Sequence, residues 1–299
     1  MQSSATPAFA AIAKLLGIAA TATSEQTVSN GATYSMVGVA GRRLRVGQWH
    51  ADAGGQLPLV ILNGIGMNIE MLEPIAGLME DRRVISFDMP GIGKSPDPIF
   101  PYTIPHIALT LAALLDRLKI DAVDVLGISW GGAVAQQFAF QHKARTGKLV
   151  LAATSAGGAM SAGSAPLMSH LLDPMEWTVQ KTMRRNLAML YNGGGASQVS
   201  LNAATAPSPV GWACQMAAFA GWTSTPYLSM LTLPVMVVAD ADDTLIPPSN
   251  AQFLHNAIPH SRLEMFQGGG HLFMFSHAEA FVQKLRGFLD GGKSTGASR

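Results

Sequence analysis

The residue of this chain best suited to covalent chemistry is a serine placed between glycines. Residues 127–131, Gly-Ile-Ser-Trp-Gly, fit the pattern G-x-S-x-G, in which the serine lies on a sharp turn between a strand and a helix. Such a turn strains the backbone, and glycines on both sides remove collisions with the adjacent strand and helix. The pattern alone is a weak signal in a chain with 31 glycines, so its context decides.

The segments around Ser129 supply that context. Residues 123–126, Val-Asp-Val-Leu, predict a short buried strand. Residues 132–139 predict a helix with small residues on its packing face. Because a strand, a serine turn and a helix together form a nucleophile elbow, we predict Ser129 as the nucleophile.

A serine hydroxyl needs a base that removes its proton and a third group that orients the base. In sheets that carry this elbow, an acid and then a histidine follow the serine, each after a later strand. Asp243 follows a predicted strand that ends at Ala239, and His271 follows three glycines after the last predicted strand. We predict His271 as the base and Asp243 as the orienting acid, with Asp242 as the alternative acid.

Attack by the serine creates an oxyanion, which backbone N–H donors stabilise. Trp130 directly follows the nucleophile and offers one N–H group. Ile65 lies between Gly64 and Gly66 in the loop after a predicted strand at residues 57–62, and these glycines let the loop approach closely. We predict the backbone N–H groups of Ile65 and Trp130 as the oxyanion hole.

Apolar strands that alternate with helical segments predict an α/β fold for the chain around these residues. We expect a mostly parallel eight-stranded sheet that is covered by helices, with a helical cap inserted between two core strands. The expected core comprises residues 31–156 and 231–292, and the expected cap comprises residues 157–230.

The cap segment is unusual in its lack of charge. From Leu187 to Ala239 the sequence contains no Asp, Glu, Lys, Arg or His. An insertion this apolar predicts a cap whose inner face binds a hydrophobic substrate. We predict Trp212, Phe219 and Trp222 as substrate-binding residues.

Composition argues against several other functions. The formal net charge of +1 gives no field that would favour nucleic acid. No ligand spacing such as H-E-x-x-H or C-x-x-C occurs, and Asp88 stands where a phosphate-binding loop ending in Lys94-Ser95 needs glycine. We predict no cofactor, no catalytic metal, no nucleic-acid partner and no integral membrane segment.

The N-terminus is predicted as an extension, residues 1–30, that is flexible or serves as a surface or targeting segment. Its first 24 residues lack acidic residues and are rich in Ala, Ser and Thr. A signal peptide in residues 1–22 is the alternative, and it would mean export. The single cysteine, Cys214, excludes an intramolecular disulfide, which agrees with a cytoplasmic protein.

From about residue 34 to 290 the chain resembles the α/β-hydrolase superfamily, and within it the intracellular depolymerases of medium-chain poly(3-hydroxyalkanoate). The resemblance implies a serine esterase that acts on a hydrophobic polyester at the surface of storage granules in the cytoplasm. Residues 240–244 differ from the usual run of that family, and residues 1–30 have no counterpart in it. The matching stretches are residues 63–68, 87–93, 126–139, 149–154, 219–224 and 270–273.

Our leading hypothesis is therefore hydrolysis of carboxylic esters through an acyl-enzyme, with a medium-chain poly(3-hydroxyalkanoate) as the substrate. A small-molecule carboxylesterase, a C–C bond hydrolase and a cofactor-free perhydrolase remain alternatives with the same catalytic residues, since one fold hosts many activities. A ligand-binding or granule-surface protein without catalysis is the non-enzyme alternative. The complete set of Ser129, Asp243 and His271 argues against it. The sequence does not predict an oligomeric state.

Overall fold

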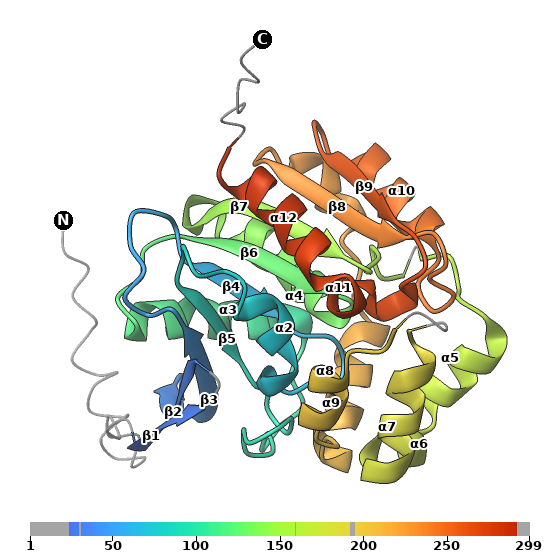
Figure 1. Cartoon of the computed structure of the whole chain (residues 1–299), viewed down its shortest axis with the longest axis horizontal. Coiled ribbons are helices and arrows are strands. Elements are labelled where there is room, and N and C mark those ends of the chain that lie inside the picture. The colour runs from blue at the N-terminus through green and yellow to red at the C-terminus, as the bar shows by residue number, and fades with distance from the viewer. Residues whose placement is uncertain (1–23, 30, 159, 192–194, 292–299) are drawn as a thin grey trace.

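The computed structural model describes residues 24–29, 31–158, 160–191 and 195–291. Its centre is a nine-stranded sheet in the order β1-β2-β3-β5-β4-β6-β7-β8-β9 (Figure 1). The strands are β1 (Ser24–Ser29), β2 (Ala32–Val39), β3 (Arg42–Trp49), β4 (Leu59–Leu62), β5 (Val84–Phe87), β6 (Val123–Ile128), β7 (Thr146–Ala152), β8 (Val235–Asp240) and β9 (Arg262–Phe266).

Most of the sheet is parallel, which confirms the predicted fold class. Strands β1, β2 and β3 pair antiparallel with one another, and β3 also pairs antiparallel with β5. All neighbours from β5 to β9 are parallel. The carboxyl ends of β4, β6, β7, β8 and β9 therefore meet at one edge of the sheet, and the loops that leave this edge can build a common site.

The expected number of eight strands is wrong by one, because β1 adds a ninth strand at the edge. This strand lies within the predicted N-terminal extension, residues 1–30. It pairs with β2 through backbone hydrogen bonds, and Val28 is 74% exposed. The sequence of this strand, Ser-Glu-Gln-Thr-Val-Ser, contains one large apolar residue, so it has no alternating hydrophobic pattern to detect. Residues 1–23 and 30, and with them the alternative signal peptide, lie outside the described residues.

Helices cover both faces of the sheet, as buried strands require. Alternate residues of the fully buried strand β4 illustrate the two layers: Val60 and Leu62 pack on one face, and Leu59 and Ile61 on the other. The first face packs against α3 (Ile104–Arg117), α4 (Trp130–Gln141) and α10 (Pro248–Ala257). The second packs against η1 (Ile69–Leu72), α2 (Glu73–Ala76), α11 (Phe273–Ser276) and α12 (Ala278–Leu289).

A helical insertion between β7 and β8 forms the predicted cap, shown mainly in yellow in Figure 1. No helix among the described residues is long and apolar enough to cross a membrane. The cap helices are α5 (Ala165–Leu172), α6 (Pro174–Thr178), α7 (Gln180–Met189), α8 (Gln198–Ala203), α9 (Pro209–Ala220) and η3 (Thr225–Met230). Short 3₁₀ helices η2 (Lys143–Arg145) and η4 (Gly270–Leu272) lie in the core.

Candidate active site

Ser129 occupies the strained turn that the sequence predicts between β6 and α4. Its backbone angles are φ 51° and ψ −118°, a conformation that non-glycine residues rarely adopt. The turn is held from both sides: Ser129 N–H donates to Ala152 O at 2.9 Å, and the Thr154 hydroxyl donates to Ser129 O at 2.7 Å. These bonds to neighbouring β7 and its following loop sustain the strain and present the serine side chain at the carboxyl edge of the sheet.

The glycines around Ser129 are required by close packing. A Cβ atom on Gly127 would lie 2.6 Å from the Cβ of Ala135, and a Cβ on Gly131 would lie 2.1 Å from Leu62 O. Side chains cannot occupy such distances, so α4 can pack this tightly against the sheet only with glycine at these positions. The local sequence thus selects the elbow, and the tertiary packing explains why its flanking residues are so small.

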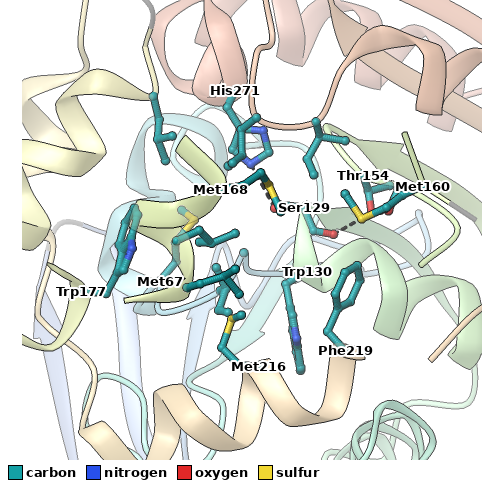
Figure 2. Close-up of a pocket in the computed structure, with 18 of the residues that line it drawn as sticks. Met67, Ser129, Trp130, Thr154, Met160, Met168, Trp177, Met216, Phe219 and His271 are labelled. Carbon is teal, nitrogen blue, oxygen red and sulfur yellow. Dashed lines mark hydrogen bonds between the residues drawn. The ribbon is translucent and has the colours of Figure 1, made fainter. Parts of the chain in front are cut away.

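His271 and Asp243 lie beside Ser129 in a continuous hydrogen-bonded chain. Ser129 Oγ is 3.0 Å from His271 Nε2 (Figure 2). His271 Nδ1 is 2.8 Å from Asp243 Oδ2. Both partners of the serine are buried. A carboxylate at Nδ1 holds the proton there and leaves Nε2 as an acceptor for the serine proton. The structure therefore brings together the three residues that the sequence predicts as nucleophile, base and orienting acid.

The two candidate acids occupy different positions. Asp243 also accepts backbone N–H groups at its second oxygen, from Leu245 and Ile246 at 2.9 Å each. Asp242 instead accepts the N–H of Gly268 at 2.8 Å, in the glycine loop that precedes the histidine. Asp243 is thus the acid in contact with the imidazole, and Asp242 fastens the loop that carries it.

The predicted oxyanion donors come from two separate segments, the loop after β4 and the first residue of α4. Trp130 is the first residue of α4, so its N–H has no acceptor within the helix. Ile65 lies in a turn in which Met67 N–H donates to Gly64 O at 3.3 Å and Gly66 has a φ of 68°. Ile65 and Trp130 both line the cavity at Ser129. Both residues of the predicted oxyanion hole therefore lie at the cavity beside Ser129, and stabilisation of an oxyanion by their N–H groups stays a prediction.

A cavity of about 220 Å³ opens at Ser129 and His271, between the sheet edge and the cap. Ser129, His271, Thr154 and Ser155 are the main polar residues that line it, and the rest of the wall is almost entirely apolar. Flexible, polarisable methionines let such a wall adapt to aliphatic ligands of varied shape. Figure 2 shows the larger side chains of this wall, Met67, Met160, Met168, Trp177, Met216 and Phe219.

Of the three aromatic residues predicted to bind substrate, Phe219 lines the cavity and the other two do not. Trp212 stacks on Trp177 with ring centroids 5.3 Å apart and is buried behind the cavity wall. Trp222 is buried in the core and donates its indole N–H to Gln137 at 2.9 Å. Trp212 thus packs inside the cap from helix α9, whereas Trp222, in the loop after α9, joins this loop to α4.

Sequence reasoning also missed residues of the cavity wall. Met168 on α5 and Trp177 on α6 line it. Both precede the uncharged stretch from Leu187 to Ala239, from which the substrate-binding residues were predicted. Glu176 is the one carboxylate or basic amine side chain in these two helices, and it is partly exposed. The periodic spacing of large apolar residues within these two short helices was the available signal, but it does not say which side faces the serine.

Buried acidic groups near the oxyanion turn support its scaffold. Asp88, after β5, accepts backbone N–H groups from Ile69 at 2.8 Å and Lys94 at 2.9 Å. Burial raises the pKa of Asp88 to about 7, although these two hydrogen bonds favour its ionised form. Burial also opposes ionisation of Glu70, but hydrogen bonds from Arg45 and Asn68 outweigh it and lower the pKa of that carboxyl. These groups hold η1 and the adjoining loop in place.

The fold and the arrangement around Ser129 define a class of protein. Residues 59–284 match the model of the Alpha/beta hydrolase family, and the chain belongs to this family. The predicted membership is therefore confirmed. Among solved structures, an esterase from Exiguobacterium antarcticum has a TM-score of 0.74 at 21% identity, covering 85% of this chain and 98% of that chain. At this level of identity the likeness supports the fold alone.

Two proteins of known activity are similar to this chain in sequence. The chain is 38% identical over 238 residues to the poly(3-hydroxyalkanoate) depolymerase of Ectopseudomonas oleovorans, covering 78% of this chain and 84% of that protein. It is 28% identical over 228 residues to 3-oxoadipate enol-lactonase 2 of Acinetobacter baylyi, covering 75% of this chain and 85% of the relative. The predicted resemblance to poly(3-hydroxyalkanoate) depolymerases is thus confirmed as a similarity of sequence.

Proposed function

We propose that this protein is a serine hydrolase that cleaves carboxylic esters through an acyl-enzyme. Ser129 Oγ bonds to the ester carbonyl carbon while His271 Nε2 takes the hydroxyl proton. The carbonyl electron pair moves onto oxygen, where the N–H groups of Ile65 and Trp130 stabilise it. His271 then gives the proton to the leaving alcohol, and Asp243 keeps the imidazole in the required tautomer. A water molecule then attacks the acyl-enzyme in the same way, with His271 as the base. The bond between Ser129 Oγ and the acyl carbon breaks, and the carboxylic acid is released.

The observation that carries this proposal is the geometry of the buried chain of hydrogen bonds. Distances of 3.0 Å from Ser129 to His271 and 2.8 Å from His271 to Asp243 are those of a working nucleophile, base and orienting acid. The strained backbone at Ser129 supports it independently, since strain of this kind clusters at functional sites.

We propose a medium-chain poly(3-hydroxyalkanoate) as the substrate, degraded at the surface of storage granules in the cytoplasm. Two observations support this choice: the apolar cavity beside Ser129, and the 38% identity to a poly(3-hydroxyalkanoate) depolymerase. Side chains of a medium-chain polyester are aliphatic, and a wall rich in methionine and leucine accommodates them without unpaired polar groups.

The test is hydrolysis of an amorphous medium-chain poly(3-hydroxyalkanoate) emulsion, with p-nitrophenyl octanoate and p-nitrophenyl acetate measured in parallel. Wild-type protein should clear the emulsion and release nitrophenol from the octanoate ester, and Ser129→Ala should abolish both activities. Ester turnover without clearing of the polymer would assign the protein to small-molecule esterases. Undiminished turnover by Ser129→Ala would refute the proposed mechanism.

A further inference from the structure

Gln215, a buried residue of cap helix α9, binds the backbone of the turn that contains Ile65 and the side chain of Trp130. Its side-chain Oε1 accepts the N–H of Gly66 at 2.8 Å. Its main-chain carbonyl accepts the indole N–H of Trp130 at 2.9 Å. The residue is fully buried, so water does not compete for these bonds. A single residue of the cap therefore joins the turn that contains Ile65 to the first residue of α4.

The side-chain bond fixes the geometry of the turn at residues 64–67. The bond from Met67 N–H to Gly64 O, with a φ of 68° at Gly66, defines a type II turn. Types I and II differ by the orientation of the central peptide, which here joins Ile65 to Gly66. The N–H bound by Gln215 belongs to that peptide. Holding it fixes the turn type, which is set by ψ of Ile65 and φ of Gly66, and ties the segment that carries Ile65 to the cap.

Helix α9 is itself fixed against the core, so Gln215 acts from a rigid support. A Cβ atom on Gly91 would lie 2.4 Å from the Cα of Gly211, near the start of α9. The two backbones are therefore in direct contact, and Ser208 N–H donates to Gly91 O at 3.1 Å. A Cβ on Gly66 would lie 3.0 Å from the ring of Trp212, which packs over the turn. Contacts on both sides of Gln215 set its distance from the oxyanion turn.

The energetics of Gln215 also indicate a role beyond packing. Its Nε2 group is buried without a hydrogen-bond partner among the described residues. An unpaired buried donor is costly, and a methionine of similar shape would remove this penalty. The atom that faces Gly66 must be an acceptor, because a backbone N–H can only donate. The amide therefore carries one unpaired donor together with the acceptor that Gly66 N–H requires, and an apolar side chain would leave that N–H without a partner.

We propose that Gln215 is a positioning residue that holds the N–H of Ile65 toward the oxyanion. The proposal rests on the proposed function, since it assigns a role within the same ester hydrolysis. The oxyanion forms only when Ser129 Oγ bonds to the carbonyl carbon and the carbonyl electron pair moves to oxygen. A misplaced donor therefore weakens binding of the transition state while leaving binding of the substrate largely unchanged. Loss of the Gln215 bond should lower kcat and leave KM nearly constant.

The experiment measures steady-state hydrolysis of p-nitrophenyl octanoate and inhibition by 1,1,1-trifluorodecan-2-one, a ketone that forms a tetrahedral adduct with an active serine. Gln215→Met should lower kcat about 10- to 100-fold and raise the inhibition constant by a similar factor. Its KM should stay within about threefold, since ground-state binding does not use the oxyanion hole. Gln215→Glu keeps an acceptor oxygen at the same distance and should restore most of the rate. Gln215→Asn shortens the side chain by one methylene and withdraws the acceptor from Gly66. It should show the same loss of kcat, and it replaces Gln215→Met as the test if the methionine variant does not fold.

Asn186→Leu is the matched control. Asn186 is a second buried cap amide, which donates to Glu176 and also has an unpaired atom, but it does not contact the oxyanion turn. Asn186→Leu should lower the thermal midpoint without raising the inhibition constant. Unchanged kinetics of Gln215→Met, or an equal rise in the inhibition constant for Asn186→Leu, would overturn the positioning role. Hydrolysis that does not depend on Ser129 would instead overturn the proposed function.

Discussion

Replacing Asp243 by asparagine tests the proposed relay with the smallest change of shape. Asp243 accepts two backbone N–H groups, from Leu245 and Ile246, at one oxygen and faces His271 Nδ1 with the other at 2.8 Å. An asparagine can keep the two backbone bonds through its carbonyl oxygen, which directs its NH₂ group at the imidazole. His271 must then accept at Nδ1 and carry its proton on Nε2, so it cannot take the proton of Ser129.

The expected loss follows from this change of tautomer. The same substitution in the serine protease triad lowers kcat by about 10⁴, which corresponds to about 5.5 kcal/mol of transition-state stabilisation. We expect a loss of that order for Asp243→Asn. The KM should change little, because Asp243 does not line the cavity at Ser129.

The assay is steady-state hydrolysis of p-nitrophenyl octanoate, with Asp242→Asn as the control. Asp242 accepts the N–H of Gly268 and lies one residue away from the proposed acid. Its substitution should leave kcat within about threefold of wild type, because the asparagine carbonyl oxygen can still accept the N–H of Gly268. The reasoning fails if Asp243→Asn keeps more than about a tenth of the wild-type kcat, or if Asp242→Asn loses as much activity.

Two further predictions concern the cavity and the pH dependence of stability. Met168→Trp should fill part of the cavity and lower kcat/KM for p-nitrophenyl octanoate about tenfold relative to kcat/KM for p-nitrophenyl acetate. If the ratio of these two values does not change, the acyl chain binds elsewhere. Glu70 has a lowered pKa in the folded protein, so its ionised form stabilises the fold above its ordinary value near 4.5, and this stabilisation is lost as the pH falls through the lowered value. Glu70→Gln should therefore lower the free energy of unfolding by about 1–2 kcal/mol at pH 7 but not at low pH. Denaturant titrations at both pH values measure the difference, and an equal difference at both would contradict the assignment.

Much of the site followed from local patterns in the sequence. The strand, serine and helix around Ser129 are encoded within about a dozen neighbouring residues, and their hydrophobic periodicity and small residues determine their form. His271 was identifiable because it follows the last strand of a parallel sheet. Strand ends in such a sheet meet at one edge, so chain order alone brings the histidine near the serine.

Other features escaped prediction because they depend on contacts without a local pattern. Strand β1 is held at the sheet edge by backbone pairing with β2, and its exposed Val28 carries no signal of burial. Trp212 and Trp222 are apolar residues of an uncharged segment, yet only the packing of helix α9 and of the loop after it decides that they do not line the cavity. Gln215 was one amide among apolar neighbours, and its partner Gly66 lies 149 positions earlier.

The sequence by itself determined the class of fold, the serine proposed as nucleophile and the chain order of its two partners, because each depends on short-range periodicity or on chain order along a parallel sheet. The tertiary structure alone decided which carboxylate of the pair Asp242 and Asp243 faces the histidine, and which aromatic side chain lines the cavity. Both depend on the direction in which each side chain points, and this direction differs between residues that lie close together in the sequence. Ser129 and His271 are 142 positions apart, and only the packed sheet brings their side chains to 3.0 Å.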